Sequence, residues 1–262
     1  EIIERHQRPG EMILTLVPML ESFLAEPATT EAHDRTRQGI VLYMASLVKH
    51  IPPDDAKVSQ VFKRLMDALS TPSEMVQRSI SQSLAALVGK AAVKPDAPLY
   101  VTSLLSTLTT TPSYAVRRGA AFGLAGLVKG LGISSLKQHG VMDRLKCAVE
   151  GKAKGEQTSN AREGALHAFE LLCEVLGRLF EPYIITILPL LLQCVADGSG
   201  GVRYAAVAAS QRIMSQLTAQ GVRMVLPALL HALAEDKWRS VHASVELLGA
   251  MAYCAPKQLS ST

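Results

Sequence analysis

The sequence predicts an all-α fold in which antiparallel helix pairs stack into an elongated α-solenoid. Three observations support this prediction. Hydrophobic residues make up 48% of the 262 residues and aromatic residues only 5%, a balance that suits helix-on-helix packing better than a β-sandwich. Apolar residues recur every three or four positions, as the buried face of a helix requires. The same helical pattern also returns about every 40 residues.

These internal repeats are the clearest feature of the chain. The pairs Leu47-Val48, Leu87-Val88 and Leu127-Val128 lie near the ends of successive helical segments, 40 residues apart. A period of this length with two helices per unit is typical of HEAT repeats. The sequence therefore predicts an array of about six HEAT units, at residues 11–49, 55–90, 97–129, 134–178, 182–216 and 220–253.

Each predicted unit has a first helix, A, and a second helix, B. The A helices are expected at residues 11–25, 55–70, 97–109, 134–150, 182–196 and 220–234. The B helices are expected at residues 33–49, 74–90, 113–129, 161–178, 201–216 and 238–253. Thr71-Pro72-Ser73 and Thr111-Pro112-Ser113 separate A from B helices, since Pro ends one helix and a Ser side chain can cap the next. Pro18, Pro189 and Pro227 inside A helices predict bends.

Positive charge is concentrated in the third and fourth units. The whole chain carries a net charge of +4, and residues 113–156 alone hold eight basic and three acidic residues. A polar insertion at 151–160 lies within this window, and insertions in a solenoid lie at the rim, where partners often bind. We predict that the basic residues contact a partner, with phosphate groups as one suitable chemistry. They are Arg117, Arg118, Lys129, Lys137, Arg144, Lys146, Lys152 and Lys154.

Some arginines have a second interpretation. An arginine at the start of a B helix, six residues after an acidic residue, is typical of an ion-pair ladder between neighbouring HEAT units. Three pairs have this spacing, namely Glu31/Arg37, Glu156/Arg162 and Asp197/Arg203. Arg117 lacks an acidic residue at that spacing, and Lys152 and Lys154 have no evident structural role. For these three residues, partner binding and a solvated surface charge without a function both remain possible interpretations.

No motif in the sequence indicates catalysis, a cofactor or a metal site. The seven histidines form no His-Glu-x-x-His pair and no metal-ligand spacing with the cysteines. Gly130-Leu131-Gly132 follows a predicted helix, so a helix cap is favoured over a dinucleotide loop. No apolar run reaches the roughly 18–20 residues of a membrane-spanning helix. We therefore predict neither an enzyme nor a membrane protein.

The cysteines and the chain ends suggest where the protein works. Cys147, Cys173, Cys194 and Cys254 lie far apart among apolar neighbours, so we expect small hydrophobic residues in the helix cores of a cytoplasmic protein. The first residues resemble no signal peptide, and the chain begins without Met. We expect a fragment of a longer solenoid.

Four runs of residues carry a resemblance to a known family. They are RRGAAFGLAGLVKGLG from Arg117, REGALHAFELLC from Arg162, LFEPY from Leu179 and SVELLGAMAYCAPKQLS from Ser244. They resemble the central region of the ribosome-associated translational activators of general amino-acid control, and also the HEAT domain of fungal translation elongation factor 3. The resemblance is strong over residues 113–262, while before that only the repeat pattern carries it.

The resemblance implies a non-catalytic scaffold that binds stalled or collided ribosomes in the cytoplasm. It implies contacts near the ribosomal stalk and binding of an ABC-type ATPase. It also implies activation of the kinase of initiation factor 2 alpha, through another part of the full-length protein. Each of these statements is an expectation from the family. Our own hypothesis is that the basic window at residues 117–154 suits ribosomal RNA or a ribosomal protein.

Two other solenoid types are alternatives. A TOG-type HEAT array would bind tubulin through the turns inside its units, usually with a Trp in the first turn. Residues 26–33 contain no Trp, and Trp238 is expected to pack with Val241 and Val245 instead. An importin-type carrier would need an acidic or Asn/Trp-lined concave face, and neither pattern is found.

Overall fold

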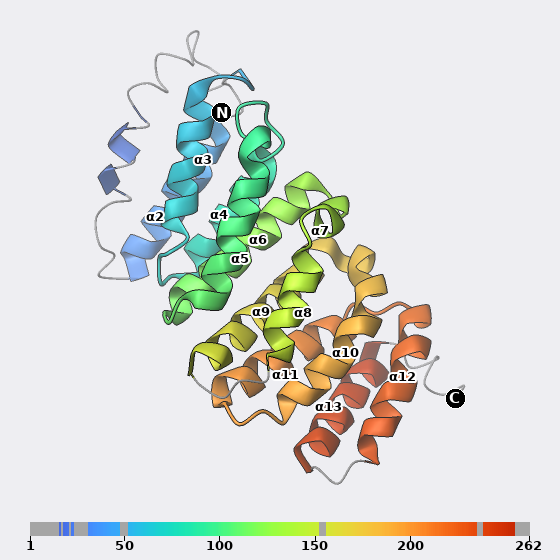
Figure 1. The fold of residues 1–262 in the computed structure, drawn as a ribbon. Helices are drawn as coiled ribbons and strands as arrows, with labels where there is room; N and C mark the ends of the chain where they lie inside the picture. Colours follow the sequence, from blue (N-terminus) through green and yellow to red (C-terminus); the bar gives the residue numbers. More distant parts are fainter. Residues whose placement is uncertain are drawn as a thin grey trace.

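In a computed structural model of the chain, all regular secondary structure of the described residues is helical. The helices follow one another as antiparallel pairs in a curved, two-layered array (Figure 1). The predicted all-α solenoid is therefore confirmed. The structure describes residues 16, 18–20, 22–23, 31–47, 52–151, 156–234 and 238–254.

The two layers correspond to the two helices of each unit (Figure 1). One layer contains the A helices α3 (Ala56–Ala68), α5 (Ala97–Thr110), α8 (Val141–Glu150), α10 (Glu181–Val195) and α12 (Ala219–Leu233). The other contains the B helices α2 (Glu31–Leu47), α4 (Glu74–Leu87), α6 (Tyr114–Leu131), α9 (Glu156–Leu176), α11 (Gly200–Met214) and α13 (Trp238–Cys254). From α4 to α11, consecutive B helices make the most extensive contacts, so the B layer holds this part of the array together.

The local sequence explains where the helices begin. The Asp55 side chain accepts a hydrogen bond of 2.8 Å from the Lys57 backbone N–H and so caps α3. Ser73 and Ser113 occupy the N-cap positions of α4 and α6, as expected, but their side chains make no capping hydrogen bond. The Ser73 carbonyl instead accepts the first helical bond, from the Gln77 backbone N–H. Ser at these turns therefore marks the helix start without capping it through its side chain.

A single hydrophobic core runs along the array. Each helix buries the apolar stripe that its sequence period predicts, and these stripes merge into one cluster from α2 to α13. Phe62 of α3, Phe169 of α9 and Phe180 of η3 are fully buried. Because each unit covers the apolar face of the next, the units depend on one another for stability.

Two glycines of α6 let its backbone approach α4 very closely. A Cβ atom added at Gly126 would lie 2.4 Å from the Ser81 carbonyl oxygen, and one added at Gly130 would lie 2.3 Å from the Ala85 carbonyl oxygen. No side chain fits at such distances. The spacing of glycines along this helix thus sets how tightly the second and third units join.

The structure differs from the prediction in the fourth unit. The A helix expected at 134–150 is divided into α7 (Ser134–Gln138) and α8, because Gly140 takes a left-handed conformation with φ of +58°. The B helix begins at Glu156, so the second half of the predicted insertion extends α9 instead of forming a loop. Two short 3₁₀ helices, η2 (Lys94–Asp96) and η3 (Gly177–Phe180), connect other units. The first predicted A helix, 11–25, lies largely outside the described residues.

One stretch, Thr158–Val195, is long and apolar enough by length and hydropathy to cross a membrane. It is not a single straight helix, since it contains α9, η3 and α10, and Gly177 at the junction has φ of +55°. Its apolar residues include Leu166, Phe169 and Ile187, which are fully buried against other helices. Part of this stretch therefore belongs to the solenoid core, and its length and hydropathy differ from the expectation that no such apolar stretch exists.

The cysteines do not all behave as predicted. Cys173 and Cys194 are buried in helix cores, as expected, but Cys147 is exposed on α8, so the prediction was wrong for this residue. The side chain of Cys254 lies outside the described residues. Burial raises the pKa of the Cys173 thiol to about 12 and that of the Cys194 thiol to about 11.

This difference predicts selective alkylation. At pH 8 iodoacetamide is expected to modify Cys147 in the folded chain and to spare Cys173 and Cys194, because thiols whose pKa is raised stay protonated and these two are also covered. Peptide mapping by mass spectrometry after timed quenching would measure the three rates. Unfolding in urea should make the rates similar. Equal rates in the folded chain would contradict the packing described for α9 and α10.

Candidate functional site

The predicted basic residues are distributed over several elements. Lys129 lies in the last turn of α6 and Lys137 in α7, and both side chains are exposed. On α8, Arg144 is exposed and Lys146 is half-buried. Lys152 and Lys154 lie outside the described residues. Four of the eight predicted residues are thus placed at or near the surface.

Arg117 is buried, which corrects the expectation that it contacts a partner. Its side chain is 4% exposed, and its Nη2 lies 2.8 Å from Oε2 of Glu163 on α9. Its Nη1 donates to the backbone carbonyls of Thr111 and Pro112 at 3.1 and 2.7 Å. Arg117 therefore joins the third unit to the fourth. The ladder spacing did not indicate Glu163, because this partner lies 46 residues downstream of Arg117 and not six residues upstream.

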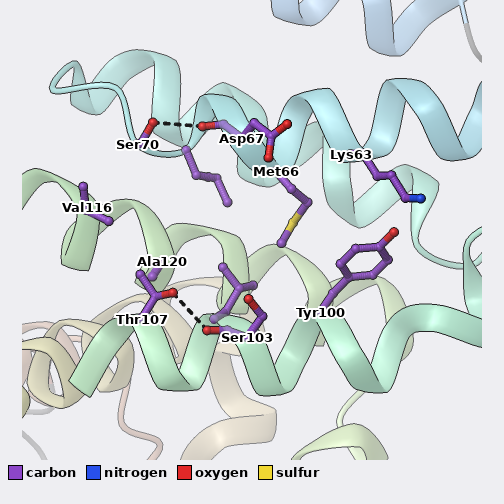
Figure 2. Close-up of a pocket in the computed structure, with 11 residues that line it drawn as sticks. Lys63, Met66, Asp67, Ser70, Tyr100, Ser103, Thr107, Val116 and Ala120 are labelled. Carbon is purple, nitrogen blue, oxygen red and sulfur yellow. Dashed lines mark hydrogen bonds between the residues drawn. The ribbon is translucent and has the colours of Figure 1, made fainter. Parts of the chain in front are cut away.

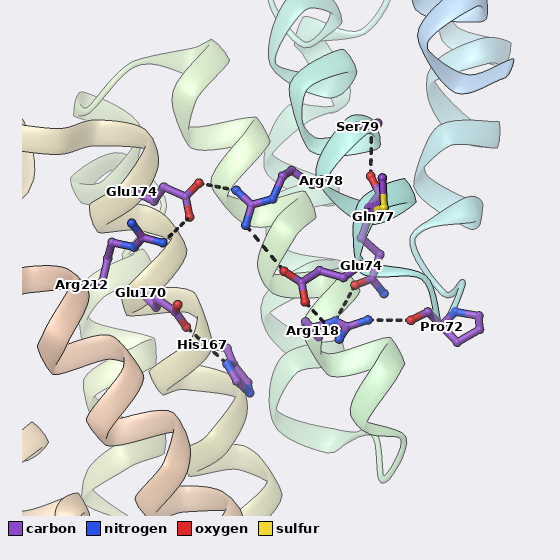
Figure 3. Close-up of polar contacts among 11 residues, drawn as sticks. Pro72, Glu74, Gln77, Arg78, Ser79, Arg118, His167, Glu170, Glu174 and Arg212 are labelled. Atoms are coloured by element: carbon purple, nitrogen blue, oxygen red, sulfur yellow. Dashed lines mark hydrogen bonds and ion pairs between the residues drawn. The ribbon is translucent and has the colours of Figure 1, made fainter. Parts of the chain in front are cut away.

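Arg118 is also engaged within the solenoid (Figure 3). Its Nε donates to Gln77 Oε1 at 2.9 Å, and its Nη2 donates to the Pro72 carbonyl at 2.6 Å. Its guanidinium carbon lies 5.4 Å from the centroid of the Tyr114 ring. These contacts join α6 to the turn before α4, so Arg118 also has a structural role that the sequence prediction did not include.

The predicted ladder is present with different partners. Arg162 Nε lies 3.0 Å from Oδ2 of Asp197, so the acidic residue belongs to the following unit and not to the preceding turn. Arg203 donates to the backbone carbonyls of Asp197 and Gly198 at 2.8 and 2.9 Å. The side chains of Glu31 and Glu156 lie outside the described residues.

A buried glutamine takes the same position in the second unit. Gln77 is fully buried, and its Nε2 donates to the carbonyls of Thr71 at 2.7 Å and of Ala115 at 2.8 Å. Thr71 lies six residues before Gln77, as Thr111 does before Arg117 and Asp197 before Arg203. The 40-residue register could have identified Gln77 as an equivalent of Arg117. Polar contacts at this position therefore stabilise the turn in each of these units.

Trp238 does not pack as predicted. It is 68% exposed at the start of α13, and Val245, one of its expected partners, is 56% exposed. The Arg239 guanidinium carbon lies 5.1 Å from the centroid of the Trp238 ring. The expected packing of Trp238 against Val245 is therefore absent, because both side chains are exposed.

The solenoid groups basic residues along the edge that holds the connections between units. We call five of them the basic edge residues, namely Lys90, Lys94, Lys129, Lys137 and Arg178. All but the half-buried Lys90 are exposed, and none of the five has an ion pair within the described part of the chain. The sequence window missed Lys90, Lys94 and Arg178, because it counted neighbours along the chain and not at equivalent ends of successive helices.

A groove between α3 and α5 has a volume of about 260 Å³ (Figure 2). The hydroxyls of Ser70 and Thr107 donate to backbone carbonyls of their own helices, and burial raises the pKa of Tyr100. The groove thus offers no activated nucleophile. Across the described ranges, no group of three His, Cys, Asp or Glu side chains is placed to hold a metal ion.

Stacked helix pairs, a 40-residue period and arginines that bridge successive units define an α-solenoid of the HEAT class. Residues 117–262 match the family described as EF3 N-terminal HEAT repeat. This match covers more than half of the chain, which therefore belongs to that family.

Relatives of the chain are much longer proteins. It is 49% identical over 251 residues to the human protein named "Stalled ribosome sensor GCN1". The aligned residues make up 96% of this chain and 9% of that protein. It is also 49% identical over 257 residues to the Dictyostelium discoideum protein named "eIF-2-alpha kinase activator GCN1", covering 97% of this chain and 9% of that protein. The chain thus spans about a tenth of the length of these relatives.

A solved structure shows the same fold at much lower identity. The structure titled "Crystal structure of Kap121p bound to Pho4p" aligns with a TM-score of 0.59 and 11% identity, over 95% of this chain and 26% of that one. At this identity the likeness concerns the fold alone.

Proposed function

We propose that this chain is a non-catalytic scaffold segment of a protein that binds stalled or collided ribosomes and helps to activate a kinase of initiation factor 2 alpha. The observation that carries the proposal is the 49% identity, over 96% of the chain, to the human protein named a stalled ribosome sensor. The Dictyostelium relative, named a kinase activator, supports the second half of the proposal. Its site of action would be the cytoplasm.

We infer that different partners bind different parts of the full-length protein. The ribosome, near its stalk, and an ABC-type ATPase would contact this segment, whereas the kinase would bind another part of the full-length protein. The small share of its relatives that the chain covers supports this division. An extended solenoid suits such a role because it offers a long surface without needing a pocket.

The basic edge residues are our proposed contact with the ribosome. Their exposed cations have no acidic partners in the described ranges, so they are free to replace counterions on phosphate groups of ribosomal RNA. Arg144 and Lys146 on α8 would extend this surface. Lys152 and Lys154 follow the other end of α8, inside the fourth unit and outside the described residues, so we do not assign them to this edge. Arg117 and Arg118 would not take part, because they bind within the solenoid.

Charge reversal at this edge tests the proposal. The double variant Lys94→Glu/Lys137→Glu is expected to weaken sedimentation with ribosomes and to lower the salt slope of binding by about one unit per lost phosphate contact. The control Lys63→Glu/Arg239→Glu makes the same charge change at exposed positions away from this edge, and it should bind like the unaltered chain. Equal binding and equal salt slopes for both variants would refute the edge as the contact.

The tubulin-binding alternative has one observation in its favour, the exposure of Trp238 at a turn within a unit. The names of the chain's relatives refer to the ribosome and to a kinase of initiation factor 2 alpha, so we do not adopt the tubulin-binding alternative. Co-sedimentation of the chain with microtubules or free tubulin would separate the two, since our proposal expects no binding there.

A further inference from the structure

One ion pair on the B layer crosses an entire HEAT unit (Figure 3). Arg78 of α4 in the second unit pairs with Glu174 of α9 in the fourth, 96 residues later. Helix α6 of the third unit lies between them, and the Arg78 guanidinium carbon is 5.3 Å from the centroid of its Phe122 ring. Helices two units apart thus come within side-chain reach, so the B layer is the concave side and is strongly bent at α6.

The backbone around α6 fits such a bend. On the concave side Gly126 and Gly130 bring α6 against α4 with no room for a side chain. On the opposite side α3 and α5 leave the groove of about 260 Å³ that Met66 and Tyr100 help to line (Figure 2). The second and third units are therefore tightly packed on the concave side and separated by a groove on the opposite side.

The carboxylate of Glu174 serves two arginines. Its Oε1 pairs with Arg78, and its Oε2 lies 3.8 Å from Nη2 of Arg212 on the neighbouring helix α11. The side chains of Arg78, Glu174 and Arg212 are 41%, 26% and 41% exposed. Ion pairs this exposed to solvent add little to stability and are weakened by salt. The Arg78–Glu174 pair is therefore dispensable for folding, but it is suited to setting the angle between the second and fourth units.

We propose that the Arg78–Glu174 pair is a reversible latch on the curvature of the solenoid. When it is closed, the second to fourth units stay bent around α6, and when it opens, they straighten and the outer groove narrows. The contact between α9 and α11 through Arg212 joins adjacent units and does not control this bend. The proposal concerns the shape of the chain and is independent of which partner it binds.

Small-angle X-ray scattering of the full chain at low salt tests the latch. Arg78→Gln and Glu174→Gln are each expected to shift the pair-distance distribution to a longer maximum dimension. The double variant should straighten no further than either single variant, because both remove one bridge. Arg212→Gln removes the same charge beside the same carboxylate, yet it should scatter like the unaltered chain. Raising the salt concentration should extend the unaltered chain and leave Arg78→Gln unchanged.

Helical circular dichroism and a melting curve would verify that each variant is folded. Identical scattering of Arg78→Gln and the unaltered chain at low salt would overturn the proposal. Equal straightening by Arg212→Gln would also overturn it, because net charge and not the bridge would then set the shape. If a variant fails to fold, the salt series on the unaltered chain decides, and a shape independent of salt counts against the latch.

Discussion

Replacing Glu163 with glutamine is expected to lower the free energy of unfolding by about 3 kcal/mol. Glu163 is the ionic partner of Arg117, and their side chains are 14% and 4% exposed. Removing one partner of a buried pair typically costs about 3–5 kcal/mol, because the other charge stays buried without compensation. The low end applies because Arg117 keeps hydrogen bonds to the carbonyls of Thr111 and Pro112.

A matched substitution at the surface gives the control for this prediction. Glu74 is 53% exposed and lies 3.5 Å from Arg118 and 3.6 Å from Arg78. Exposed ion pairs contribute about 0–1 kcal/mol, so Glu74→Gln should change stability by less than about 1 kcal/mol. Urea unfolding followed by circular dichroism measures both variants. A loss for Glu163→Gln no greater than that for Glu74→Gln would show that the Arg117–Glu163 pair is not buried as described.

Replacing both Arg117 and Glu163 distinguishes the loss of their attraction from the cost of leaving one charge buried without a partner. The double variant Arg117→Met/Glu163→Leu removes the whole pair and leaves apolar side chains between α6 and α9. Apolar replacement of a buried pair is often neutral or stabilising, so the double variant should be more stable than Glu163→Gln alone. This outcome would assign the cost of Glu163→Gln to the unpaired guanidinium.

The fold was predictable from the sequence because its units repeat. The Leu-Val pairs at 40-residue spacing and the apolar stripes indicate the order of the helix pairs, and both depend on residues close in the chain. The fate of Arg117 was not predictable in the same way, because its partner Glu163 comes from the next unit. A search within one unit cannot find a contact made between two units.

The same distinction explains the other errors. Cys147 precedes Ala148 and Val149, and Trp238 has helical spacing to Val241 and Val245, yet both residues lie on the exposed sides of α8 and α13. The basic window at 113–156 combined buried Arg117 with exposed Lys137 and left out Lys94, which lies at the same edge of the preceding unit. Charge counted along a solenoid becomes informative only after each residue is assigned to a face or an edge.

Replacing Gly126 with alanine is expected to lower the free energy of unfolding by about 1–2 kcal/mol, although this substitution usually raises it. In the middle of a helix this change normally stabilises by about 0.5–1 kcal/mol, because glycine has the larger conformational freedom in the unfolded chain. Here the new Cβ would lie 2.4 Å from the Ser81 carbonyl oxygen, so α6 and α4 must move apart. Such overpacking costs about 1–3 kcal/mol and outweighs the gain.

Gly249 provides the comparison, since it is exposed within α13 and a Cβ added there would have no other atom within 4 Å. Gly249→Ala should therefore stabilise the chain by up to about 1 kcal/mol, the usual gain for this substitution. Opposite signs for the two variants in urea unfolding are the expected result. If both substitutions stabilise, α6 does not lie against α4 as closely as described. The tight concave joint on which the Arg78–Glu174 latch depends would then be absent as well.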